Sequence, residues 1–480
     1  MSTHTAVGRP VQRAWPIVGH GLALRSRPLE FFAELHRTPE PLARIRLGSR
    51  DAYLVTAPEL IVSLLRGKEA HSVEKGAFFE AMRALLGDGV SVSAEPKHLR
   101  HRRLMAPAFH HEKIAGYVRI MQQEADAMVD SWSDGARLEL DDRLRVLAMR
   151  IVAKALFASE LGEAVVAESL RSFPVIVDEL PKRTMMPWLA RIPLRNRTFD
   201  AAVRRLSDAI DHIIAEYRAS ETDYGDLVSM LLTARFDDGT ALTDRELHDE
   251  VMTLYAAGFA TTANTMAFAF YELARRADVR ERVEEEVAEV LRGGPVTADN
   301  IQRLQYTERV MAETLRRYAP TWLGTRETIE KLDLGGVTLP AGTTLFYSPY
   351  TLHNNPKYFD DPARFDPDRW TPEYRKTVTR SGVYQPFGLG NRNCIGEPFA
   401  WYEAVTILAT VVARARLEVV PGAAVHEVAR ATLEVNHLPV TVRLRTAVLH
   451  TPSGEHHQPL FAKAPDVAGR PGLRDPSPKA

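Results

Sequence analysis

A single cysteine, Cys394, stands in a sequence that leaves little freedom to the chain around it. Glycines occupy positions 388, 390 and 396, and an arginine precedes the sulfur by two residues. Glycine allows tight turns and lets the backbone approach a flat ligand closely. A helix is predicted from Glu397 onward, so that its N-terminal N–H groups and dipole favour a thiolate at Cys394. We therefore predict a loop whose thiolate is an axial ligand of haem iron.

Two other roles for this cysteine belong to different classes of protein. An isolated cysteine is commonly a small buried apolar residue, but such a residue requires neither neighbouring glycines nor an arginine. A cysteine nucleophile of the hydrolase type requires a histidine base, and no histidine lies near Cys394 in the sequence.

The segment from Phe387 to Gly396 reads Phe-Gly-Leu-Gly-Asn-Arg-Asn-Cys-Ile-Gly. It resembles, at every diagnostic position, the haem-binding signature of the cytochrome P450 family. The resemblance implies haem b as the cofactor and Cys394 as the axial ligand of its iron. It also implies contacts to the cofactor from Phe387, Gly388 and Gly396.

The composition is that of an ordinary globular protein and excludes some classes of partner. Of the 480 residues, 45% are hydrophobic and 26% are charged, and the formal net charge is −1. This balance gives no general attraction to nucleic acid or to a membrane surface. One cysteine excludes an intramolecular disulfide and fits a reducing compartment, so we expect a cytoplasmic protein.

The order of sequence patterns predicts a mainly α protein with a minor β part. Residues 97–318 show mostly helical patterns. Alternation in 43–47 and 52–56 predicts a β-hairpin, and 334–350 returns to strand-like runs.

We expect a single large domain over residues 1–447 and a flexible polar tail, rich in proline and glycine, over 448–480. The resemblance extends from Pro16 to Leu444. It implies the P450 fold, in which the haem is buried between a central helix and the cysteine loop.

Residues Val251 to Tyr271 carry no charge and are numerous enough to cross a membrane. Several of them are polar, which is costly in lipid but expected beside a buried site. We therefore predict the central helix of a soluble protein and no membrane span.

This helix contains the sequence Ala257-Gly258-Phe259-Ala260-Thr261-Thr262. Gly258 and the threonines can loosen the helical hydrogen bonds and open a groove for dioxygen. The resemblance implies that Gly258 adjoins the cofactor and that Thr261 and Thr262 help to position dioxygen and deliver protons. Ala260 stands where the family usually has an acid, so the protons must come through water, Thr262 or a substrate hydroxyl.

Glu313 and Arg316 are three residues apart in a helical segment, which brings their charges onto one face. Arg369 follows in the segment between this helix and the cysteine. The ordered set resembles the structural Glu-Arg-Arg network of the same family, which holds the cysteine loop under the haem. Asp368 and Trp370 replace the residues that usually flank the second arginine.

A haem with two propionates requires cations. His98 and Arg102 lie one helical turn apart and can face the same anion. The resemblance assigns propionate contacts to His98, Arg102, Arg326 and Arg392. The remaining cations Arg100, Arg103 and Lys113 are a hypothetical docking patch for an acidic electron donor.

The resemblance also implies an apolar substrate pocket above the haem. Its predicted lining residues are Phe78, Phe79, Tyr255, Phe259, Ala260, Thr321, Trp322, Leu323, Asn436 and His437. Such a lining favours a bulky hydrophobic substrate over a sugar or a nucleotide.

Together these features predict a haem-thiolate monooxygenase, a monomer that hydroxylates or epoxidises a natural product with O2. A terpenoid is the first expectation and a polyketide or macrolide the second. No cysteine is left for an iron–sulfur cluster, so the electrons are expected from a ferredoxin and its NAD(P)H-dependent reductase. The alternatives are a peroxide-driven or rearranging haem-thiolate enzyme and a haem sensor without turnover.

Overall fold

The structure, a computed structural model, describes residues 19–157, 159–185, 193–220 and 223–445. The tail predicted at 448–480 lies outside these residues. The helices in chain order are α1 (Gly21–Ser26), α2 (Pro28–His36), α3 (Pro58–Arg66), α4 (Ala77–Leu86), α5 (Lys97–Met105), α6 (His111–Asp130), α7 (Leu140–Leu156), α8 (Ser159–Met185), α9 (Pro193–Ser220), α10 (Leu227–Thr233), α11 (Asp244–Arg275), α12 (Ala277–Leu291), α13 (Gln305–Arg317), α14 (Pro349–His353), α15 (Pro372–Arg380) and α16 (Glu397–Arg414).

The strands are shorter and fewer than the helices. They are β1 (Leu42–Leu47), β2 (Arg50–Val55), β3 (Val73–Lys75), β4 (Arg137–Glu139), β5 (Gly324–Thr328), β6 (Leu332–Leu334), β7 (Val337–Leu339), β8 (Thr344–Tyr347), β9 (Ala415–Val419), β10 (Glu427–Ala429), β11 (Leu433–Val435) and β12 (Pro439–Leu444). The predicted class, mainly α with a minor β part, is confirmed.

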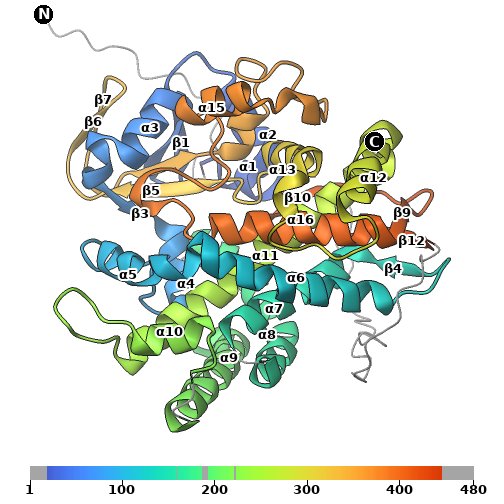
Figure 1. Cartoon of the computed structure of the whole chain (residues 1–480). Coiled ribbons are helices and arrows are strands. Elements are labelled where there is room, and N and C mark those ends of the chain that lie inside the picture. The colour runs from blue at the N-terminus through green and yellow to red at the C-terminus, as the bar shows by residue number, and fades with distance from the viewer. Residues whose placement is uncertain (1–18, 158, 186–192, 221–222, 446–480) are drawn as a thin grey trace, which may run out of the picture.

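Helix α11 crosses the middle of the molecule and contains the uncharged segment found in the sequence (Figure 1). It begins with a capping box, in which the Thr243 hydroxyl accepts from the N–H of Glu246 and the Glu246 carboxylate accepts from the N–H of Thr243. It is buried on most sides because it packs against α7, α9, α13 and α16. Among the described residues, no helix has the length and hydropathy that a membrane crossing requires.

The largest sheet has the strand order β1-β2-β8-β5-β3, with β2 and β8 parallel and the other neighbours antiparallel. The predicted hairpin is confirmed as β1 and β2, which pair from Leu42 with Val55 to Leu47 with Arg50. The strand-like runs at 334–350 end earlier than predicted, at Tyr347 in β8. Ser348 accepts a hydrogen bond from the N–H of Thr351 and thereby starts the short helix α14.

One hydrophobic core extends from α4 to β12 and includes the buried faces of α6, α7, α11 and α16. Helices α6 and α16 lie side by side through the middle of the molecule, and the five-stranded sheet with α1 to α3 lies at one end (Figure 1). The cysteine loop enters this arrangement directly before α16. The core therefore fixes the position of α16 relative to α11, and with it the position of the loop.

Candidate functional site

Cys394 lies in a tight loop directly before α16. Its N–H donates to the carbonyl of Phe387 at 2.8 Å, which closes the loop on itself. Gly388 and Gly390 have φ angles of +74° and +72°, a region that residues with a side chain rarely adopt. A Cβ on Gly390 would also overlap the carbonyl oxygen of Leu65 in α3. The loop thus depends on these glycines both for its turn and for its close contact with α3.

Cys394 as a residue keeps solvent-accessible surface, although protein atoms surround its thiol. Burial raises the pKa of the Cys394 thiol, and this effect outweighs the N–H of Gly396 and the charges of Arg102 and Lys75, which lower it. The helix N-terminus and the nearby cations favour the thiolate, as expected, but burial opposes them. The anion requires the additional charge of a bound metal ion.

One face of α11 is open in the middle of an otherwise buried helix. Ala257 is exposed, and Ala260 and Thr261 are half-buried. Positions separated by three and four residues share a helix face, so these three side chains border the same space. The Thr261 hydroxyl donates to the carbonyl of Ala257 at 3.1 Å, and the helix stays continuous rather than opening at this point. Small side chains and one hydroxyl therefore line this face.

Thr262 points to a different neighbour from Thr261. It is buried, and its hydroxyl lies 3.0 Å from Oε2 of Glu403 in α16 and 3.2 Å from the carbonyl of Gly258. Glu403 is completely buried, and burial raises its pKa to about 8. Glu403 was not predicted as a site residue, although it is an acid within the apolar run of α16.

Three residues of α11 that were predicted to lie near the cofactor or the pocket pack against neighbouring helices. A Cβ on Gly258 would lie 2.8 Å from Cγ2 of Val152, so this glycine allows α11 and α7 to cross closely. Tyr255 and Phe259 are buried and surround the ring of Phe173 in α8. Because each helical residue turns about 100° from the last, Tyr255 and Phe259 face away from the open side of Ala257 and Thr261, whereas Gly258 lies at its edge.

Strands β3 and β5 bring together cations that are distant in the sequence. Lys75 pairs across the strands with Arg326. The pKa of Lys75 lies well below its ordinary value because of burial and the charges of Arg326 and Arg392. Burial, Arg392 and Lys75 likewise contribute to lowering the pKa of His98 to about 4. These mutually repelling groups form a site for an anion, and Lys75 was missed because only the strand pairing brings it there.

The side chains predicted to bind the propionates make hydrogen bonds and ion pairs within the chain. Arg392 donates to the carbonyl of Ser93 at 2.6 Å and lies 3.0 Å from Glu74. Arg326 donates to the carbonyl of Thr325, and His98 lies 2.8 Å from Glu95. These bonds hold the three side chains in place.

Arg102 is tied to the cysteine loop itself. Its guanidinium donates to the backbone carbonyl and to the side-chain oxygen of Asn393, at 2.7 and 2.6 Å. Arg100 of the hypothetical docking patch is also engaged within the chain, because it pairs with Asp238 at 2.8 Å and covers the ring of Phe236. Arg100 is therefore a weaker candidate for partner binding than the sequence alone indicated.

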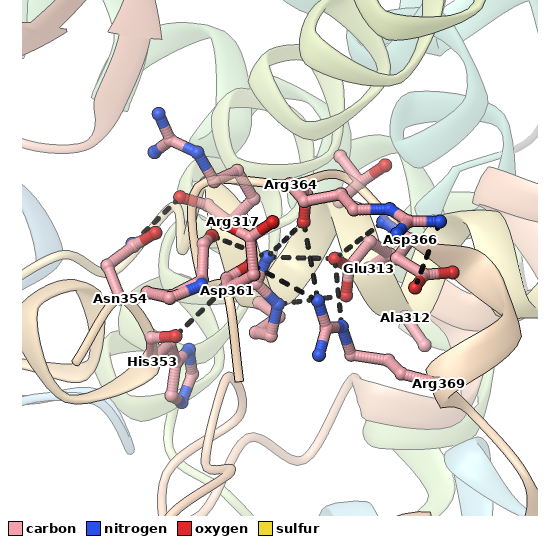
Figure 2. Close-up of polar contacts among 12 residues, drawn as sticks. Ala312, Glu313, Arg317, His353, Asn354, Asp361, Arg364, Asp366 and Arg369 are labelled. Carbon is pink, nitrogen blue, oxygen red and sulfur yellow. Dashed lines mark hydrogen bonds and ion pairs between the residues drawn. The ribbon is translucent and has the colours of Figure 1, made fainter. Parts of the chain in front are cut away.

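Figure 2 shows Glu313 and Arg369 pointing toward one another, and the hydrogen bonds of Glu313 join both to the fully buried Arg316. Arg316 donates two hydrogen bonds of 2.8 Å to the Glu313 carboxylate, and Arg369 donates a third at 3.2 Å. The indole N–H of Trp370 donates a fourth at 2.9 Å, which a phenylalanine at this position would not provide. Arg316 also donates to the carbonyl of His353 at 2.9 Å.

His353 connects this network to the segment before the cysteine loop. Its Nε2 accepts from the N–H of Gln385 at 3.0 Å, and burial lowers its pKa to about 3. The hydroxyl of Tyr384 donates to the carbonyl of Ala312 in α13. The network thus fixes α13 to the chain that leads into the loop at Phe387.

The remaining pocket predictions fall into two groups. Phe78 and Phe79 of α4 are half-buried, and Phe79 lies 3.9 Å beneath the amine of Lys75, next to the cation cluster. Thr321 is exposed, whereas Trp322 and Leu323 pack against the apolar cluster of α2 and the sheet. Phe78 and Phe79 remain candidates for contact with a ligand.

Asn436 and His437 lie at the base of the β10–β11 hairpin rather than at its tip. Asn436 bonds to the backbone of Ala424 and His426, which closes the base. The tip is formed by residues 430–432, and there the hydroxyl of Thr432 accepts from Asn264 of α11 at 2.9 Å. The tip of the hairpin, rather than Asn436 and His437, makes the hydrogen bond to α11, and the pocket contact of these two residues stays a prediction.

The arrangement fits the haem that the resemblance implies. Haem requires an axial ligand, an apolar slot and positive charge at its propionates. Cys394 offers a sulfur, the Ala257 face of α11 is small and largely apolar, and the cluster of Lys75, Arg326 and Arg392 offers the charge. The described residues therefore include a candidate for the axial ligand, for the apolar slot and for the positive charge that haem requires.

Comparisons with known proteins agree with this arrangement. The family model described as Cytochrome P450 matches residues 10–440. The chain is 40% identical over 426 residues to cyclooctat-9-en-7-ol 5-monooxygenase of Streptomyces melanosporofaciens, covering 86% of this chain and 92% of the relative. It is 36% identical over 447 residues to pentalenene oxygenase of Streptomyces avermitilis, covering 93% and 98%. The crystal structure of the cytochrome P450DA heme domain matches with a TM-score of 0.82 at 25% identity, covering 91% of this chain and 97% of that chain.

Proposed function

Because this chain belongs to the cytochrome P450 family and is a haem-dependent monooxygenase, we propose that it hydroxylates or epoxidises a bulky terpenoid. The relatives' names mention cyclooctat-9-en-7-ol and pentalenene, which are both terpenoids. The small side chains at Ala257 and Ala260 leave room for such a compound, and the half-buried rings of Phe78 and Phe79 add apolar surface. A polyketide or macrolide is the second candidate, because its bulk and apolar surface are similar.

The observation that most supports this function is the single cysteine in its loop beside a cluster of cations. We assign Cys394 as the axial ligand and Lys75, Arg326, Arg392 and His98 as the groups that hold the propionates. Bound haem supplies the activation of O2. Thr261 offers a hydroxyl on the open face of α11 that can orient O2 and pass a proton.

Family enzymes of this kind need redox partners as well as O2. We propose that a ferredoxin and its NAD(P)H-dependent reductase donate the electrons, since the one cysteine of this chain cannot hold an iron–sulfur cluster. The chain is expected to act as a monomer. The cytoplasmic location and the division into a domain at 1–447 and a tail remain predictions.

The test is product analysis with a panel of terpenes and macrolactones. We expect an oxygenated terpene when ferredoxin, its reductase, NADPH and O2 are all present, and one oxygen atom from labelled O2 in the product. Turnover only with hydrogen peroxide would favour the peroxide-driven alternative, which the alanine at position 260 makes the main competitor. Turnover of macrolactones alone would exclude the terpenoid assignment.

A further inference from the structure

Asn264 is a buried amide on the open face of α11, and its hydrogen-bonding groups are only partly used. It lies one turn beyond Thr261, on the side of the helix that Ala257 and Ala260 share. The residue is 7% exposed, and its side-chain N–H donates to the hydroxyl of Thr432 at 2.9 Å. An asparagine amide offers two N–H groups and an oxygen that accepts two hydrogen bonds. Within the part of the chain that the structure describes, the bond to Thr432 is the only one that this amide makes.

The amide lies at the closed end of the open face. Phe268, one turn beyond Asn264 on the same side of α11, is 2% exposed and stacks on the ring of Tyr318, with 4.2 Å between the ring centroids. In the other direction the face presents the methyl groups of Ala257 and Ala260. Asn264 and Thr432 therefore form a polar end to a space that small and apolar side chains border.

Thr432 is held in this position by the tip of the β10–β11 hairpin. The N–H of Leu433 donates to the carbonyl of Pro320 at 2.9 Å, and the indole N–H of Trp322 donates to the carbonyl of Arg430 at 2.9 Å. The tip is thus joined to the chain that follows α13 on both sides of Thr432.

The base of the hairpin is fixed through Glu427 in β10. Its carboxylate accepts from the hydroxyl of Tyr350 in α14 at 2.6 Å and pairs with Arg317 in α13 at 3.1 Å. A group that is held in place before binding loses little freedom when a ligand arrives. The hydroxyl of Thr432 is therefore preorganised for a partner on the open face.

The chemistry of this pair fits a hydroxyl group better than other groups. The oxygen of Asn264 can accept from the O–H of a ligand, and the hydroxyl of Thr432 can donate to the oxygen of the same ligand. A half-turn of the amide exchanges its NH2 group and its oxygen, and the pair then still offers both a donor and an acceptor. A ketone would use only the donor, and a hydrocarbon would leave both polar groups buried without a partner.

We propose that Asn264 and Thr432 bind a hydroxyl group of the substrate, so that the enzyme prefers a terpene alcohol to the parent hydrocarbon. The proposal rests on the proposed oxygenation of a terpenoid and narrows its substrate class. The amide lies about 4.5 Å from Thr261 along the helix axis, so the carbon skeleton of a bound alcohol extends over Ala260 and Thr261. The carbon that is oxidised is then a different one from the carbon that carries the hydroxyl.

The experiment measures dissociation constants of the holoenzyme from the shift of its Soret band on ligand binding. The probes are two pairs of an alcohol and a matching hydrocarbon: cedrol with α-cedrene, and abietadienol with abietadiene. We expect the wild type to bind each alcohol about ten- to a hundredfold more tightly than its hydrocarbon, the gain from two net hydrogen bonds.

Two substitutions remove the proposed contacts, and a third is the matched control. N264L nearly keeps the volume of the side chain but removes its polar groups, so the alcohols should bind no more tightly than the hydrocarbons. The affinity for the hydrocarbons should stay the same or rise, because no polar group is then left without a partner. T432V should also lose the preference, whereas T432S retains the hydroxyl and should keep it.

Equal affinities of the wild type for alcohol and hydrocarbon in both pairs would overturn the proposal. Variants N264L and T432V that weaken the binding of both kinds of ligand alike would also contradict it, since the two side chains would then only fasten the hairpin to α11. Should N264L not fold, the comparison of T432V with T432S decides in the same way. Failure of the proposed function is distinguishable, because no terpenoid would then be oxygenated, whereas this proposal fails when terpenoids are bound and oxygenated without preference for an alcohol.

Discussion

At the scale of single residues, two buried glutamates illustrate opposite solutions to the same problem. Glu313 is surrounded by donors from Arg316, Arg369 and Trp370, so its negative charge is compensated. Glu403 has one hydroxyl as a partner and avoids the cost of burial by keeping its proton. The first arrangement stabilises the path to the cysteine loop, and the second leaves a titratable proton near Thr261.

The neutral state of Glu403 predicts a pH dependence of stability. Between pH 4.5, the ordinary pKa, and about 8, the unfolded chain has lost this proton while the folded chain retains it. The free energy of unfolding should therefore fall as the pH rises through this range, by up to ~1.4 kcal/mol per pH unit from this group. E403Q should remove this contribution, as measured by denaturant unfolding at pH 5, 6.5 and 8.

The free energy of unfolding of the wild type should therefore fall relative to that of E403Q as the pH rises. The free energy of unfolding of E403Q minus that of the wild type should be larger at pH 8 than at pH 5. Parallel pH curves for the two proteins would show that Glu403 is ionised in the folded state.

The sequence predicted those site residues whose signal is local. Cys394 is flanked by its glycines, and Glu313 and Arg316 lie one turn apart. Lys75 and Glu403 were missed because their roles depend on the pairing of β3 with β5 and the crossing of α11 with α16. Nothing in their immediate sequence indicates those neighbours.

At the scale of elements, the close crossing of α11 and α7 depends on Gly258, which has no side chain. Gly258 faces Val152, and the methyl groups of that valine occupy the space where a Cβ would lie. The same glycine lies between the open face at Ala257 and the hydrogen-bonded Thr262, so any shift of the helix would move both. Packing between two helices thereby determines the geometry of the site.

G258A should destabilise the protein despite the higher helix propensity of alanine. We expect a loss of about 1–3 kcal/mol from overpacking against Val152, measured by thermal or denaturant unfolding of the holoenzyme. The double variant G258A/V152A should recover part of this loss, because it frees the space. A G258A protein as stable as the wild type would show that the helices separate without cost.

Helices and strands with a clear hydrophobic periodicity could be predicted from the sequence. Their contacts with other elements could not. The β1–β2 hairpin, the helix at 251–271 and the helix after Cys394 all appear in the structure. The turn of the β10–β11 hairpin at 430–432, which bonds to α11 and is followed by a bond to Pro320, was not predicted from the sequence. Periodicity identifies an element but not the direction in which its end points.

At the scale of the whole molecule, several packed clusters position the parts of the site. The cysteine loop rests on α3 and leads into α16, while α11 crosses α16 through the contact between Thr262 and Glu403. The five-stranded sheet adds Lys75 and Arg326 from two of its strands. Parts that are hundreds of residues apart in the sequence therefore meet around the sulfur of Cys394.

The most direct test of this account is the absorption spectrum of the reduced holoenzyme with carbon monoxide. A sulfur–iron bond at Cys394 predicts the strongly red-shifted Soret band of a thiolate-ligated haem in the wild type and its loss in C394A. A wild-type spectrum without this band, or a C394A spectrum identical to that of the wild type, would contradict the account.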